Sequence, residues 1–160
     1  MKRCGLFGRA TILLLLTTAP ALADIIGSAR VIDGDTMAIG KIRIRLYGID
    51  APEAKQSCLR PGNAIYLCGA EATKILRSVT RDQEVRCKPK DQDRYGRVVA
   101  ICWAGPIDLN RMMVAQGWAV AYRHYSERYV QEEDAARRGR LGIWSGKFEL
   151  PAEWRRQHPR

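Results

Sequence analysis

The sequence predicts a mainly β protein of the α+β class, in which five strands close into a small barrel accompanied by three α-helices. Three observations indicate this class. Short stretches rich in β-branched residues alternate with turn signals along residues 25–47. A helix-like segment separates them from two further strand-like stretches, and two more helix-like segments follow. The chain has 160 residues and no internal repeat, which suits a single domain and excludes solenoids and propellers.

The first three strands follow from alternation and from turn residues. Residues 25–32 are rich in β-branched side chains and end at the Asp-Gly-Asp turn signal of residues 33–35. Residues 36–39 form a short second strand, after which a Gly-Lys pair turns the chain. Apolar and polar side chains alternate along residues 42–47, which is the pattern of a strand with one buried face.

Helical spacing and capping residues set the later elements. Asp108 is a good N-cap, and Gly117 ends the helix that it begins. Ser126 is expected to cap a third helix, which ends at Gly139. The expected order after residue 53 is a loop at 54–68, a helix with apolar residues on one face at 72–79, strands near 83–88 and 97–103, a helix at 108–117, an extended stretch at 118–122, a helix at 126–139 and a loose polar tail at 155–160.

This strand order is that of a five-stranded OB-fold barrel. Three strands form a meander and the last two close it, and barrels of this type often bind oligonucleotides across one face. The formal net charge is +10. A basic excess suits an anionic partner, either nucleic acid or acidic lipid. No basic amphipathic helix supports the lipid alternative.

The first 23 residues have the pattern of a secretory signal peptide. Three basic residues lead into an apolar run at residues 10–19, and the Ala-Leu-Ala of residues 21–23 is a small-residue cleavage site. The run is shorter than the roughly 20 residues that a spanning helix needs, which argues against a retained anchor. Cleavage removes three basic residues and no acidic one, so the net charge of the remaining chain is +7. A secreted or periplasmic protein is expected.

Four cysteines remain after the leader, and an even number in an exported domain indicates two disulfides. Two antiparallel strands joined by a turn near residues 93–96 bring Cys87 and Cys102 nearly opposite each other. This pair is favoured among the three possible pairings, and Cys58 and Cys68 then close the preceding loop. A zinc site is the alternative, but the chain has no Cys-x-x-Cys and its two histidines are remote in sequence.

Three carboxylates at predicted strand ends indicate a metal site. Asp33, Asp35 and Asp50 each lie beside a turn, and ordinary turn chemistry explains each of them alone. If the second and third strands pair, both turns lie at the same end of the sheet. Carboxylates held close together raise one another's pKa unless a cation neutralises them. Hard oxygen ligands of this kind suit Ca²⁺ or Mg²⁺.

Two arginines and a fourth carboxylate suit a phosphodiester substrate. Arg45 lies on the third strand and Arg97 follows the turn near residues 93–96, and each alone is most often a surface arginine. Beside a bound cation, their guanidinium groups stabilise the charge that develops as a phosphodiester is displaced. Glu53 lies close enough in sequence to orient or deprotonate an attacking water.

Three segments resemble the signatures of the thermonuclease, or staphylococcal-nuclease-like, family. They are Val-Ile-Asp-Gly-Asp-Thr at 31–36, Arg-Leu-Tyr-Gly-Ile-Asp-Ala-Pro-Glu at 45–53 and Asp-Arg-Tyr-Gly-Arg at 93–97. Later segments, at 109–119 and 139–144, resemble the closing helices of the family. With the signal peptide at 1–23, the expected organisation is an OB-fold domain that resembles staphylococcal nuclease at 24–146 and a basic C-terminal tail at 147–160.

The resemblance also implies a Ca²⁺-dependent phosphodiesterase that cuts DNA and RNA and leaves 3′-phosphate ends. The implied site comprises the metal ligands Asp35, Asp50, the backbone carbonyl of Ala51 and, through water, Asp33; the general base Glu53; the phosphate clamps Arg45 and Arg97; and the nucleotide contacts Arg94, Tyr95 and Tyr122. The chain departs from the family pattern in having alanine at 51, arginine at 94 and two cysteines in the 55–68 loop.

A non-catalytic OB module that binds nucleic acid or a protein is the alternative function. The complete set of carboxylates and arginines argues against it, because carboxylates in an anion-binding groove weaken phosphate binding unless a metal or a reaction employs them. No stable protein partner and no membrane attachment after signal cleavage are expected, and a monomer is the expected state.

Overall fold

The computed structural model describes residues 23–159, so the expected signal peptide lies outside the described residues except for its last position. The strands are β1 (Ile25–Val31), β2 (Thr36–Ile39), β3 (Ile42–Leu46), β4 (Ile49–Asp50), β5 (Cys58–Leu59), β6 (Ile65–Tyr66), β7 (Glu84–Gln92), β8 (Val98–Ala104), β9 (Ile107–Asp108) and β10 (Val120–Ala121). The helices are α1 (Cys68–Thr80), α2 (Leu109–Ala115), α3 (Val130–Arg138), a 3₁₀ turn (Gly142–Ser145) and α4 (Pro151–Gln157).

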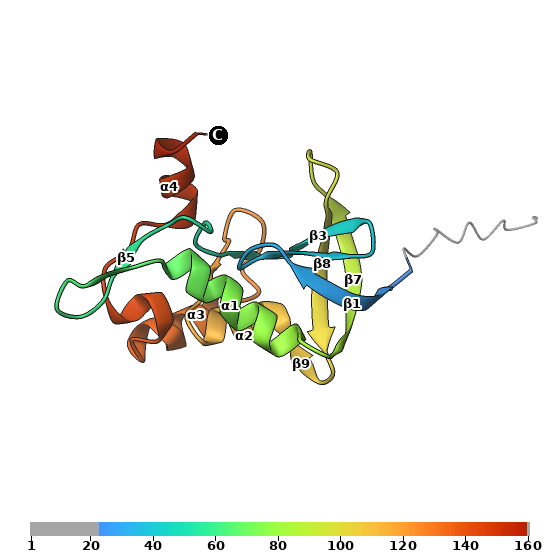
Figure 1. Cartoon of the computed structure of the whole chain (residues 1–160), viewed down its shortest axis with the longest axis horizontal. Helices are drawn as coiled ribbons and strands as arrows, with labels where there is room; N and C mark the ends of the chain where they lie inside the picture. The colour runs from blue at the N-terminus through green and yellow to red at the C-terminus, as the bar shows by residue number, and fades with distance from the viewer. Residues whose placement is uncertain (1–22, 160) are drawn as a thin grey trace, which may run out of the picture.

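Five strands form a closed barrel (Figure 1). β1, β2 and β3 pair as an antiparallel meander, β7 pairs with β1, and β8 pairs with β7. A parallel pairing of β3 with β8, from Ile44 opposite Val98 to Leu46 opposite Ala100, closes the barrel. The predicted five-stranded OB-type barrel is therefore confirmed. The short strand β9 continues the sheet beyond β8.

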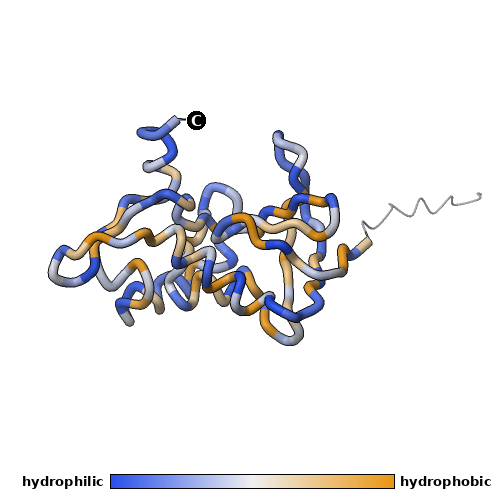
Figure 2. The backbone as a smooth tube through the Cα atoms, in the orientation of Figure 1, coloured by the Kyte–Doolittle hydropathy of each residue, from blue (hydrophilic) through white to orange (hydrophobic). Residues whose placement is uncertain are grey.

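The barrel and the helices share one apolar core. Ile44 of β3, Leu76 of α1 and Met113 of α2 have no exposed surface and belong to the same cluster of buried side chains. Burying a side chain of this size stabilises the fold by roughly 1.5–3 kcal/mol. Figure 2 shows the complementary pattern, in which the tip of the β7–β8 hairpin and most of α4 are hydrophilic.

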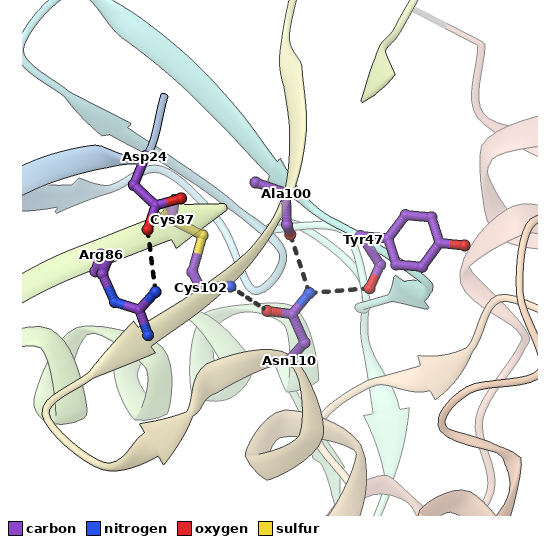
Figure 3. Close-up of a disulfide and its surroundings, with 7 residues drawn as sticks. All are labelled: Asp24, Tyr47, Arg86, Cys87, Ala100, Cys102 and Asn110. Atoms are coloured by element: carbon purple, nitrogen blue, oxygen red, sulfur yellow. Dashed lines mark hydrogen bonds and ion pairs between the residues drawn. A yellow bond between two sulfur atoms is a disulfide. The ribbon is translucent and has the colours of Figure 1, made fainter. Parts of the chain in front are cut away.

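Both favoured disulfides are formed. Cys87 of β7 and Cys102 of β8 lie directly opposite each other in the antiparallel ladder, with their Cα atoms 4.0 Å apart (Figure 3). Cys58 and Cys68 close the preceding loop, with their Cα atoms 5.6 Å apart. The alternative of a zinc site built from these thiols is thereby excluded. Disulfides of this kind are typical of proteins that fold in an oxidising compartment.

A buried asparagine joins the barrel to α2. The amide oxygen of Asn110 accepts a hydrogen bond from the Cys102 backbone N–H at 3.0 Å. Its amide nitrogen donates to the carbonyls of Tyr47 at 2.9 Å and Ala100 at 3.1 Å (Figure 3). The side chain has no exposed surface, and its amide supplies hydrogen bonds to backbone groups of three different residues in the interior.

The elements after residue 53 differ from the prediction in three places. The expected third helix begins at Val130, and Ser126 instead accepts a hydrogen bond from the backbone of Arg128 before it. The expected loop at 54–68 contains the small hairpin of β5 and β6. The expected loose tail contains a fourth helix, α4, so the described residues hold four α-helices rather than three. None of the helices among residues 23–159 is long and apolar enough to cross a membrane.

Candidate active site

The Asp-Gly-Asp turn between β1 and β2 is held against two other parts of the chain. The backbone N–H groups of residues 32 and 33 both donate to the carbonyl of Thr36, and the Asp33 carboxylate accepts from the Asp35 N–H at 3.1 Å. A Cβ on Gly34 would come within 2.7 Å of the Ala51 side chain and 2.9 Å of that of Ala72. Only glycine allows this approach, which brings the turn to the end of β4 and to α1.

Asp35 and Asp50 converge on one guanidinium nitrogen. Nη2 of Arg45 lies 2.9 Å from Oδ1 of Asp50 and 3.3 Å from Oδ2 of Asp35. Asp35 also accepts from the Ala51 backbone N–H at 3.2 Å and from the Thr36 hydroxyl at 2.8 Å. Asp35 is 5% exposed and Asp50 is 1% exposed, so two carboxylates are buried together. Two of the three carboxylates expected at these strand ends therefore share one partner.

The charges in this cluster perturb one another. Burial, with the nearby Asp35 carboxylate, raises the pKa of Asp33 to about 6. Burial likewise raises the pKa of Asp50 above its usual range, although its two arginine partners favour the charged form. Burial opposes the charge of Arg45, but Asp35 and Asp50 outweigh it and raise the pKa of Arg45. Because buried carboxylates this close together repel each other, both stay ionised only when positive charge lies nearby.

Glu53 lies in the same cluster, in the loop after β4. Its Oε1 is 3.0 Å from Nη1 of Arg155, and its side chain is 17% exposed. Gln56, which is fully buried, accepts a hydrogen bond from the Glu53 backbone N–H at 3.2 Å and donates one from its own backbone N–H to the Glu53 carbonyl at 2.7 Å. The carboxylate that the sequence suggested as a general base is therefore held beside Asp50 by a short, tight loop.

Arg155 is the site residue that sequence reasoning missed. Its Nη1 and Nη2 lie 2.9 Å from Oδ1 and Oδ2 of Asp50, a bidentate pair, and Nη1 also reaches Glu53. These carboxylates raise the pKa of Arg155 above its usual range despite its burial. The residue lies in the tail that was expected to be loose. Pro151 is the sequence feature that indicates a helix in this tail, because proline is favoured in the first turn of a helix.

Arg97 lies just before β8, the strand whose parallel pairing with β3 closes the barrel. Arg45 is opposite Val99 in the parallel β3–β8 pair, and Arg97 precedes Val99 by two residues. Side chains two residues apart leave a strand on the same face, which places both arginines on one side. Nε of Arg97 lies 2.7 Å from Asp93, and this contact outweighs burial and lowers the pKa of the Asp93 carboxyl. Arg97 is thus oriented from within its own hairpin.

The expected nucleotide-contacting residues occupy two places around the arginines. Tyr95 is 66% exposed at the hairpin tip, where its hydroxyl accepts from Arg94 at 2.8 Å and the Arg97 guanidinium lies 5.5 Å from its ring centre. Tyr122 follows β10, and the Arg45 guanidinium lies 5.9 Å from the centre of its ring. Tyr125 extends this aromatic surface, with its ring centre 5.1 Å from that of Tyr122.

The donor set fits a hard divalent cation in part. Two buried carboxylates that face one point are suitable oxygen ligands for Ca²⁺ or Mg²⁺, and Ca²⁺ takes its remaining ligands from backbone carbonyls and water. No group of three or more His, Cys, Asp or Glu residues within 23–159 is arranged to hold a metal ion. In the arrangement described, Arg45 and Arg155 provide the positive charge that these carboxylates require.

Comparison with known proteins agrees with this geometry. Residues 43–146 match the model of the family described as staphylococcal nuclease homologue. A micrococcal nuclease from Shigella flexneri is 35% identical, over 92% of this chain and 90% of that protein. A thermonuclease from Staphylococcus hyicus is 33% identical, over 72% of this chain and 73% of that protein. The succinoglycan biosynthesis protein ExoI of Rhizobium meliloti is 37% identical, over 86% of this chain and 73% of that protein.

The family match covers the barrel from β3 onward, together with Asp50, Glu53 and both expected phosphate clamps. It ends before α4, so Arg155 lies outside the matched region. The resemblance inferred from the three signature segments is confirmed by the match and by the relatives. The chain belongs to the family of staphylococcal nuclease homologues.

Proposed function

We propose that this chain is a secreted, Ca²⁺-dependent endonuclease that hydrolyses phosphodiester bonds of DNA and RNA. The observation that carries the proposal is the convergence of Asp35 and Asp50 on Arg45, with Glu53 in the same ion-pair cluster. Relatives named micrococcal nuclease and thermonuclease support a nucleic-acid substrate. The two disulfides support folding outside the cytosol.

Asp35, Asp50 and the backbone carbonyl of Ala51 are the proposed ligands of the calcium ion, and Asp33 is proposed to contact it through water. When bound, the ion supplies positive charge for a phosphate oxygen. Asp35 is already fixed for this role by two hydrogen bonds, from Thr36 and from the Ala51 backbone. A ligand that is held in place loses little conformational entropy when it binds.

The proposed reaction uses the remaining residues in distinct roles. The Glu53 carboxylate takes a proton from water as the water oxygen bonds to phosphorus. The bond from phosphorus to the 5′ oxygen breaks and that oxygen takes up a proton from solvent water, which leaves a 3′-phosphate and a 5′-hydroxyl. Arg45 and Arg97 bind the non-bridging oxygens and stabilise the charge that develops on them. Arg94, Tyr95 and Tyr122 are proposed to contact the nucleotide beside the scissile phosphate.

The test is cleavage of plasmid and single-stranded DNA by the oxidised protein that begins at residue 24, with Ca²⁺, with Mg²⁺ and with chelator. Glu53→Gln is expected to lower kcat by about 10²–10⁴-fold, the usual contribution of a general base. Glu84→Gln is the matched control, because Glu84 is exposed on β7. Cleavage that persists with chelator or in Glu53→Gln contradicts the proposed mechanism. Salt-sensitive DNA binding without cleavage favours the non-catalytic binding module instead.

A further inference from the structure

Helix α4 lies outside the family domain and packs against little of the molecule. It projects away from the barrel (Figure 1), and no other described helix or strand packs extensively against it. Pro151 at its start is the only buried residue of its seven. A hydrophobic face is what usually fixes a helix to a domain. Since only Pro151 of α4 is buried and Ala152 and Trp154 are half-buried, the position of the helix depends mainly on the chain before it and on Arg155.

The segment before α4 is anchored to the loop closed by Cys58 and Cys68. Leu59 and Lys147 exchange two backbone hydrogen bonds, at 2.8 and 3.0 Å. The buried side chain of Gln56 donates to the carbonyl of Glu149 at 2.7 Å. The same Gln56 side chain accepts from the backbone of Glu53. The beginning of α4 is therefore fixed next to the candidate active site, whereas the body of the helix is not.

Arg155 is the main contact between the body of α4 and the site. It uses both terminal nitrogens on the two oxygens of Asp50 and shares one of them with Glu53. Asp50 Oδ1 also accepts from Arg45. A carboxylate offers about four lone-pair positions, and three of those on Asp50 are already occupied. A calcium ion bound by Asp50 needs the same oxygens and carries charge of the same sign as the guanidinium.

We propose that Arg155 is a built-in competitor of the catalytic cation, and that α4 is a lid which cation binding releases. The inference rests on the proposed function, because it takes Asp50 as a cation ligand and Glu53 as the base. With α4 docked, Arg155 neutralises Asp50 and holds the Glu53 carboxylate in an ion pair. Release of α4 removes the Arg155 guanidinium from both carboxylates at once. Cation binding and α4 docking therefore oppose each other by one coupling free energy, which is reciprocal.

The first test is calorimetric titration of Ca²⁺ into the oxidised protein that begins at residue 24 and into its Arg155→Gln variant. Removal of the competitor is expected to lower the Kd for Ca²⁺ by about tenfold, within the range of about 5–150-fold that is common for coupled sites. Arg155→Lys keeps the charge but loses the bidentate geometry, and is expected to lie between the two. Arg156→Gln is the matched control, because Arg156 is largely exposed and pairs only loosely with Glu153 of the same helix.

The second test is hydrogen exchange of the backbone amides of residues 151–157. In the unaltered chain, Ca²⁺ is expected to speed exchange in α4, because it displaces Arg155. In Arg155→Gln, α4 is expected to exchange quickly with or without Ca²⁺. Because Asp50 keeps Arg45 as a partner in this variant, the barrel is expected to remain folded, although with a lower melting temperature. If it does not fold, Arg155→Lys and the exchange data on the unaltered chain still decide the question.

The outcomes distinguish failure of the lid proposal from failure of the proposed nuclease function. Unchanged Ca²⁺ affinity in Arg155→Gln, or slower α4 exchange on adding Ca²⁺, overturns the lid. If the same samples still cleave DNA in a Ca²⁺-dependent way that requires Glu53, the proposed nuclease function stands and only the lid is overturned. If neither protein binds Ca²⁺, the lid is overturned together with the calcium-dependent function. Tighter Ca²⁺ binding in Arg155→Gln together with Ca²⁺-induced release of α4 supports the lid.

Discussion

At the scale of single residues, the site is a balance of buried charges in which each group depends on its neighbours. Asp50 is 1% exposed and is paired with two arginines, Arg45 and Arg155. Removing one partner from a buried ion pair leaves an uncompensated charge, which costs far more than the pair contributes. A cluster of three buried charged side chains that depend on one another therefore indicates a functional role rather than a stabilising one.

Asn110 is the residue whose loss should most weaken the fold. Asn110→Ala removes a hydrogen bond from the Cys102 N–H and from the carbonyls of Tyr47 and Ala100, although the Ala100 carbonyl still accepts from the Tyr47 N–H. An unsatisfied buried group costs about 1–3 kcal/mol, so a loss of about 3 kcal/mol is expected in the free energy of unfolding. Urea unfolding measures it, with Gln83→Ala, an exposed change, as the control. A loss below about 1 kcal/mol contradicts the role assigned to this amide.

Tyr129 should make the fold sensitive to high pH. Its ring has no exposed surface, its hydroxyl has no hydrogen-bond partner within residues 23–159, and burial raises its pKa from 10.0 to about 12. Because the folded state keeps this proton where the unfolded chain loses it, the contribution to stability is complete below pH 10 and falls as the pH rises from 10 toward 12.

Tyr129→Phe is therefore expected to be as stable as the parent or slightly more stable at pH 8, and to lose less stability at pH 11. Unfolding in urea at several pH values between 8 and 11 measures the difference between the two proteins. This difference isolates Tyr129, because all other groups that titrate in this range are common to both. Parallel curves for the two proteins across this range would contradict the assignment.

At the scale of elements, alternation and capping predicted most of the fold because they are local signals. β2 has the predicted bounds, β1 and β3 end one residue early, and Asp108 caps α2 by accepting from the Arg111 backbone. The turns at the strand ends predicted that Asp35 and Asp50 lie close together, and in the structure both carboxylates contact Arg45. Arg155 could not be found in this way, because its contact with Asp50 spans 105 positions and leaves no periodic pattern in the sequence.

The disulfide between β7 and β8 is expected to stabilise the hairpin that carries Arg97. Replacing Cys87 and Cys102 together by alanine should lower the free energy of unfolding by about 3 kcal/mol, the value of the loop-entropy model for a closed loop of this length. Cleavage measured well below the melting temperature should change little, because Arg97 is still held by Asp93 and by the β3–β8 pairing. Loss of cleavage in a variant that remains folded would show that the disulfide positions the arginine.

At the scale of the whole molecule, the basic charge should govern how the protein meets nucleic acid. The chain without its first 23 residues carries a net charge of +7, and Arg94 and Tyr95 are exposed at the tip of the β7–β8 hairpin. Binding of an oligonucleotide to the Glu53→Gln variant should weaken steeply as salt rises from about 50 to 200 mM, because counterions are released from the phosphates.

Arg94→Gln in that background should reduce the slope of log Kd against log salt by about one, if Arg94 neutralises one phosphate. Arg138→Gln is the comparison, because it removes one charge of the same kind from the exposed end of α3. Equal slopes for the two substitutions would assign the effect to overall charge instead of to a contact at the hairpin tip.

The parallel pairing that closes the barrel has a consequence for the order of folding events. Ile44 and Val98 are 54 positions apart, and Arg45 comes opposite Val99 only when these strands meet. Pairings between such distant segments form late, since the chain loses loop entropy before the contacts compensate. A chain whose helices and β1–β3 meander have formed, but whose β3 and β8 have not yet paired, would not cleave nucleic acid. Cleavage should therefore be the last property regained on refolding, after far-UV circular dichroism has recovered.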